Sequence, residues 1–193
     1  MPSRLLKPDD ILPDSLKLVG YFARNTAVPP DWSTSPATAH ITEIASAGGC
    51  VNQVPPGWIE HWLHNDCGFF NSPLDARLVV PADAGGFTLF AYRLLPVRFV
   101  EGRREAFDIG DAQVEPLPAG FRSVGFDTAN KLYSSYFECT PLSCNYLANE
   151  VPVNVHCLVD TLEEAVALAE RCSVEQPEPG TYYVLEVLRE SAA

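Results

Sequence analysis

The densest group of chemically reactive side chains lies between residues 139 and 157. Cys139, Cys144, His156 and Cys157 bring three thiols and one imidazole together within 19 residues. Thiolate sulfur and imidazole nitrogen are preferred ligands of Zn²⁺, so these four residues could hold a zinc ion. Structural zinc sites usually begin with a C-x2-C pair, however, whereas four residues separate Cys139 from Cys144. We therefore expect no cofactor, and zinc is the alternative.

The same residues also fit a cysteine nucleophile. A thiol becomes reactive at neutral pH when a base or a positive charge lies beside it, and His156 could serve Cys139 or Cys144 in this way. If the protein is an enzyme, Cys139, Cys144 and His156 are the candidate catalytic residues. A simpler interpretation is that the cysteines act as small apolar residues of the core, beside a hydrogen-bonded histidine. Residues 151–159 have the apolar pattern of a strand, in which His156 and Cys157 would point to opposite faces.

Two amphipathic helices are predicted from the pattern of apolar residues and end signals. The first covers residues 56–67, which begin at Pro-Pro-Gly and end before Gly68. The second covers residues 161–172, where Thr161 and Glu164 have the spacing of a capping box. We expect both helices to pack one apolar stripe against a sheet.

Apolar and aromatic runs predict strands at residues 16–22, 87–99 and 181–189. Strands and helices together predict the α+β class, with a mixed, largely antiparallel sheet. A chain of 193 residues is long enough to bury a sizeable core. We predict a single compact α+β domain over residues 16–193, preceded by an extended arm of residues 1–15 that is rich in proline and aspartate.

The composition excludes several classes of partner. The chain has 13 basic and 25 acidic residues, so its net charge of -12 argues against nucleic acid held on a basic surface. The longest apolar run is interrupted by arginine and proline, so we expect no membrane-spanning segment. No hydrophobic leader is evident at the N-terminus, which favours a cytoplasmic location with reduced thiols. The sequence does not predict an oligomeric state.

The acidic residues are concentrated in the C-terminal half. Residues 1–100 carry 7 basic and 9 acidic side chains, whereas residues 101–193 carry 6 and 16. Complementary charge steers protein association, so we predict a protein-binding or regulatory module that docks on the basic surface of a partner. Such a module would be an inhibitor, an immunity-type protein or an accessory subunit; the alternative is a zinc-dependent or cysteine-nucleophile enzyme. The predicted partner-binding residues are Glu163, Glu164, Glu170, Tyr136 and Tyr146.

Overall fold

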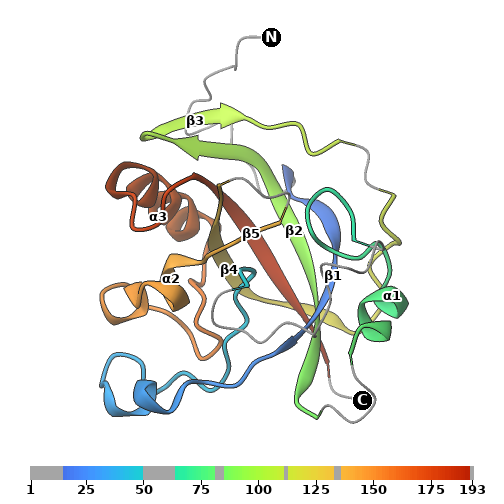
Figure 1. The fold of residues 1–193 in the computed structure, drawn as a ribbon, viewed down its shortest axis with the longest axis horizontal. Coiled ribbons are helices and arrows are strands. Elements are labelled where there is room, and N and C mark those ends of the chain that lie inside the picture. Colours follow the sequence, from blue (N-terminus) through green and yellow to red (C-terminus); the bar gives the residue numbers. More distant parts are fainter. Residues whose placement is uncertain (1–14, 50–63, 81–84, 111–112, 133–135, 192–193) are drawn as a thin grey trace.

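The molecule is built on one antiparallel sheet, shown in Figure 1. The computed structural model describes residues 15–49, 64–80, 85–110, 113–132 and 136–191. The strands are β1 (Lys17–Asn25), β2 (Phe87–Val100), β3 (Arg103–Ala106), β4 (Phe121–Lys131) and β5 (Thr181–Glu190). They lie in the order β1-β2-β5-β4, and β3 pairs with the far end of β2. The predicted α+β class is confirmed, and every strand pair in the described part of the chain is antiparallel.

Both faces of the sheet are covered. Successive strand side chains point to opposite faces, and the neighbours Val184 and Leu185 of β5 accordingly belong to two different apolar clusters. The cluster around Leu185 contains Phe90 and Phe70, and the cluster around Val184 contains Leu142. This double coverage explains why the β5 sequence is apolar on both faces and does not alternate with polar residues.

Helix α3 (Leu162–Glu175) confirms the second predicted helix. The Thr161 hydroxyl accepts from the Glu164 N–H, and the Glu164 carboxylate accepts from the Thr161 N–H, so the capping box is complete. The helix buries Leu162, Ala165 and Ala169 against the sheet. No helix among the described residues is long and apolar enough to cross a membrane. The remaining helices are short: η3 (Pro30–Thr34), α1 (Pro73–Leu78), α2 (Pro141–Cys144) and η4 (Leu147–Asn149).

The prediction of a helix over residues 56–67 finds no support in its described part. Residues 56–63 lie outside the described residues, and residues 64–67 form a bridge and a turn. The turn forms because the Asn65 side-chain carbonyl accepts from the N–H groups of Cys67 and Phe69. The predicted arm also lies outside the described residues, except for residue 15.

The prediction of a strand over residues 151–159 is wrong. The segment is irregular and touches the sheet through one isolated bridge, between Val159 and Phe126. The side-chain carbonyl of Asn154 accepts from the N–H groups of His156 and Leu158, which bends the chain away from a strand. Cys157 then takes a left-handed conformation with φ of 60°. This bend determines where His156 points.

Candidate functional site

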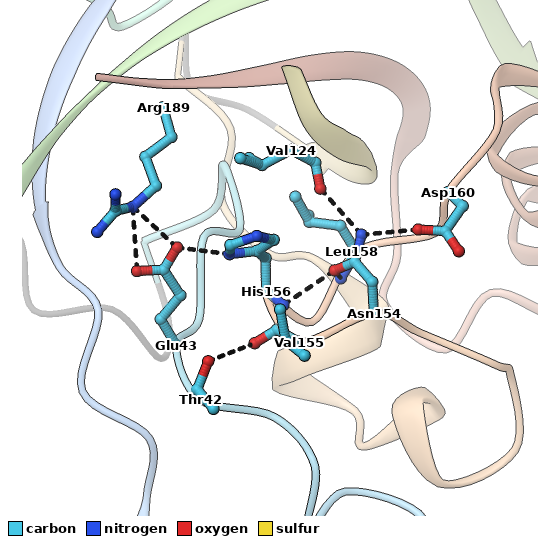
Figure 2. A network of polar contacts seen from close by, with 9 residues as sticks. All are labelled: Thr42, Glu43, Val124, Asn154, Val155, His156, Leu158, Asp160 and Arg189. Carbon is cyan, nitrogen blue, oxygen red and sulfur yellow. Dashed lines mark hydrogen bonds and ion pairs between the residues drawn. The ribbon is translucent and has the colours of Figure 1, made fainter. Parts of the chain in front are cut away.

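His156 belongs to a network of polar contacts that includes Glu43 and Arg189 (Figure 2). Its Nδ1 lies 2.6 Å from Oε1 of Glu43. Arg189, near the end of β5, places its Nε 3.0 Å from Oε1 and 3.2 Å from Oε2 of the same carboxylate. All three side chains are largely buried. Glu43 therefore joins a loop histidine to the sheet.

The contacts of Glu43 determine which nitrogen of His156 carries a proton. A carboxylate beside a guanidinium accepts hydrogen bonds, so Nδ1 of His156 must be the donor in the 2.6 Å contact. In neutral imidazole one nitrogen donates and the other accepts. Nε2 is then left with a lone pair, which is the arrangement that a histidine general base requires.

Backbone contacts keep the two loops in register. The N–H of Thr42 and the N–H of Glu43 both donate to the carbonyl of Val155, at 2.9 and 3.2 Å. The N–H of Ala45 donates to the carbonyl of His156 at 3.1 Å. The loop of residues 42–45 thus runs beside the bend at residues 154–156, and this pairing sets Glu43 against the imidazole.

Asn154 ties the bend to the edge of the sheet. Its Nδ2 donates to the carbonyl of Val124 in β4 at 2.9 Å and to Oδ1 of Asp160 at 3.0 Å, as Figure 2 shows. The backbones approach closely at Gly125, where a Cβ atom would lie 2.8 Å from the carbonyl oxygen of Val159. Asn154 and Gly125 therefore fix the position of the bend that carries His156.

His156 borders an open pocket of about 500 Å³ at the β4 edge, which we call the His156 pocket. Its lining residues are Arg122, Ser123, Val124, Gly125, Asn154, Val155, His156 and Asp160. Arg122 is exposed and lies directly opposite Arg189 in the β4 and β5 register. Among the described residues Arg122 has no ion pair, whereas Arg189 is paired with Glu43. The pocket thus offers an unneutralised guanidinium, an imidazole and the Asp160 carboxylate.

The predicted zinc residues do not gather around a common centre. No group of three or more histidine, cysteine, aspartate or glutamate side chains suited to a metal ion occurs in the described ranges. Cys157 is fully buried, while Cys139 and Cys144 are half-buried. His156 directs Nδ1 to Glu43.

Burial also opposes ionisation of two thiols. Desolvation, together with the nearby Asp127 and Cys144, raises the pKa of Cys157 well above its usual range. Desolvation raises the pKa of Cys172 to about 12. A thiolate is thus disfavoured at both positions.

The predicted partner-binding residues have different environments. Glu163 is exposed on α3, whereas Glu164 closes the capping box and Glu170 pairs with Arg104. The ring of Tyr146 is half-exposed and lies 5.9 Å from that of Trp32. Tyr136 is half-buried, packs against the first apolar cluster and contacts Gly68.

Sequence reasoning missed most of the His156 network. Within this network, the sequence indicates only His156 as a site residue. The residues next to Glu43 and Arg189 form no motif that would predict a role for either side chain. Asn154 did carry a signal, because an asparagine side chain often hydrogen-bonds the backbone two residues further on and so forms a turn. Comparison with known proteins adds nothing to this site, because no family model, curated protein or solved structure matches the chain.

Proposed function

We propose that this protein hydrolyses a small anionic substrate in the His156 pocket, with His156 as the general base. One observation supports this proposal above the others: Glu43 holds Nδ1 of His156, which leaves Nε2 as a proton acceptor, and His156 lines an open pocket. Glu43 and Arg189 would act as positioning residues, because they touch the imidazole and its partner but do not line the pocket.

Arg122 indicates the substrate class. A guanidinium binds carboxylate or phosphate oxygens through charge-assisted hydrogen bonds, and Arg122 is exposed at the pocket without an ion pair among the described residues. Asp160 supplies an acceptor for a hydroxyl or amine of the same substrate. The favoured substrate is therefore small, polar and anionic.

The proposed step needs water as the only co-reactant. Nε2 of His156 takes a proton from water while the water oxygen attacks the substrate carbonyl, and the proton then passes to the leaving oxygen as the ester bond breaks. The imidazolium formed in between is stabilised by the Glu43 carboxylate, as in other carboxylate-histidine pairs. No cysteine takes part in this scheme.

Binding is tested with inorganic sulfate, followed by the backbone amide resonances of the full chain. We expect sulfate to shift amides in residues 122–125 and 154–160, and the Arg122→Gln variant to bind it about tenfold more weakly, since one charge-assisted hydrogen bond contributes about 1.5 kcal/mol or more. Arg103→Gln removes an exposed arginine on β3 and should bind like the wild type. Equal binding by the Arg122→Gln variant would overturn the anion site.

Catalysis is tested with 4-acetoxybenzoate, an anionic ester, against neutral phenyl acetate. We expect hydrolysis of the anionic ester to fall by about 10²-fold or more in the His156→Gln variant, the usual loss for a general base. Arg122→Gln should reduce hydrolysis of the anionic ester and leave that of phenyl acetate unchanged. If His156→Gln retains the wild-type rate, or the wild type is inactive toward both esters, the proposed reaction is wrong.

A second candidate function is docking on a basic protein surface, as the charge of the sequence suggests. The observation in its favour is a shallow apolar groove of about 250 Å³ beside α3, lined among others by Val151, Leu168 and Glu164. Glu163 lies exposed on the same helix. The test probe is an amphipathic lysine-leucine peptide: salt-sensitive shifts confined to α3 and lost in Glu163→Lys would support docking. Shifts spread evenly over the molecule would count against it.

We also propose that the protein is located in the cytoplasm. This location is supported by Cys67, Cys157 and Cys172, which are buried free thiols, because cysteines stay reduced in that compartment.

A further inference from the structure

The buried side chains of Arg24 and Asp127, which can carry opposite charges, both hydrogen-bond the backbone of one loop residue, Ala47. We call this arrangement the clamp. Oδ2 of Asp127 in β4 accepts the N–H of Ala47 at 2.6 Å, and Nη2 of Arg24 in β1 donates to the carbonyl of Ala47. Arg24 also donates to the carbonyl of Gly48 at 2.9 Å and to the hydroxyl of Tyr92 at 2.8 Å. Side chains from β4 and β1 thus hold the N–H and the carbonyl of Ala47, respectively.

This clamp is built from groups that are costly to bury. Arg24 is 3% exposed and Asp127 is completely buried. Each nitrogen of the Arg24 guanidinium donates a hydrogen bond, but Oδ1 of Asp127 has no hydrogen-bond partner in the described part of the chain. Apolar residues of similar volume often give a core the same or greater stability than a buried charged pair. The presence of Arg24 and Asp127 in the core therefore points to a role beyond packing.

The clamped residue lies on the loop that carries Glu43. Between Glu43 and Ala47, the N–H of Ala45 donates to the carbonyl of His156, and the apolar side chain of Ile44 is fully buried. This stretch of five residues is thus fixed at Ala47 by the clamp and at Ala45 by the backbone of His156. A shift of Ala47 would be passed along these few bonds to Glu43.

We propose that Arg24 and Asp127 are positioning residues for the His156 pocket, which act through Ala47 to set the carboxylate of Glu43 against the imidazole, and that the clamp tightens when Asp127 is ionised. The inference rests on the proposed function of the pocket, which it extends from the His156 network to the core. Ionised Asp127 accepts the Ala47 N–H more strongly and attracts the guanidinium that holds the Ala47 carbonyl. Protonation weakens both contacts.

Among the ionisable groups that face one another at this position, Asp127 is the one that titrates near neutral pH. Arg24 faces it from β1, Tyr92 from β2 and Cys157 from the bend. Burial raises the pKa of both Tyr92 and Cys157, so these two groups keep their protons. Burial raises the pKa of Asp127 to about 7, although the N–H groups of Ala47 and Thr128 and the charge of Arg24 lower it.

The experiment follows the amides of Ala45 and Ala47 by pH titration in the His156→Gln variant, where the imidazole cannot contribute. We expect both amides to share one inflection, because Ala47 reports the Asp127 contact and Ala45 reports its transmission toward Glu43. Adding Asp127→Asn should abolish the inflection at both amides. Glu186→Gln, which removes another buried carboxylate that pairs with Arg93, should leave it intact.

Each outcome supports or overturns the inference without a ligand. An inflection at Ala47 with a flat Ala45 would show that the clamp titrates but positions nothing. A flat response at both amides would show that Asp127 does not titrate there. If the double variant fails to fold, the His156→Gln titration alone still decides between these results. Failure of the proposed function is seen separately, as lack of sulfate binding by the wild type at Arg122.

Discussion

Glu43 and His156 are 113 positions apart in the chain, yet their side chains meet at 2.6 Å. The contact joins a loop that follows η3 to the bend that precedes α3, and Arg189 of β5 fastens it to the sheet. Three distant segments thus meet at one carboxylate. The contact exists only in the folded chain, so it reports tertiary structure and the state of the pocket together.

Removing the charge of Glu43 should loosen this junction. In Glu43→Gln, Arg189 keeps its burial but loses its counter-charge, and we expect the free energy of unfolding to fall by about 1–2 kcal/mol in a urea titration. Nitrogen NMR of the imidazole should show a mixture of tautomers in place of one. The control is Glu101→Gln, which breaks an exposed ion pair with Arg103 and should cost no more than about 0.5 kcal/mol. A single tautomer in Glu43→Gln would contradict the assignment.

Asp127 should make the stability of the fold depend on pH. Its pKa is raised from the ordinary 3.8 to about 7 by burial, so the folded state holds this proton more tightly than the unfolded state. The resulting stabilisation is complete below pH 3.8 and is lost as the pH rises to about 7. Relative to Asp127→Asn, the wild type should lose up to about 4 kcal/mol of unfolding free energy across this range. A pH-independent difference between the two proteins would show that Asp127 is not a buried titrating group.

Gly125 should not tolerate a side chain. It has φ of 138°, and an added Cβ would lie 2.8 Å from the Val159 carbonyl and 2.9 Å from Cβ of Leu158. We expect Gly125→Ala to lower the free energy of unfolding by about 2–4 kcal/mol and to displace the bend that carries His156. Gly49→Ala is the matched control, because nothing lies within 4 Å of its Cβ position. A normal stability and an unchanged His156 spectrum in Gly125→Ala would refute the close approach.

Cys157 and Cys172 should be unreactive in the native protein. Both are fully buried and burial raises both pKa values, so iodoacetamide at neutral pH should label them far more slowly than the same thiols in urea. Peptide mass spectrometry resolves each site. The same experiment tests the cysteine-nucleophile alternative, because labelling of Cys139 or Cys144 faster than in urea would support it. Rapid labelling of Cys157 would contradict its burial.

Local signals in the sequence predicted the regular elements best. Helix α3 follows from a capping box and an apolar stripe, which are set by neighbours within a few residues. Strands β2 and β5 follow from apolar runs bounded by turn residues. The segment 151–159 has the same apolar pattern, but the hydrogen bonds of Asn154 prevailed over it.

The site was less predictable than the fold. His156 was identified as a reactive residue, but its partner was sought among cysteines near in sequence, whereas the structure pairs it with Glu43. Arg122 lies directly across from Arg189 because of the register of β4 and β5. A single sequence without an alignment does not define that register. The residues next to Asp127 in the sequence do not predict that its carboxylate is buried. The burial results from the sheet, which brings β1, β2 and β4 together.

The strand order has a consequence for how the chain reaches this structure. β5 lies between β2 and β4 in the sheet, yet it comes after the other four described strands in the sequence. Until residues 181–190 leave the ribosome, β2 and β4 each present an unpaired edge, and unpaired edges invite association with other chains. Nascent chains that stall before this point should depend on chaperones, and closure of the sheet should be a late and slow event.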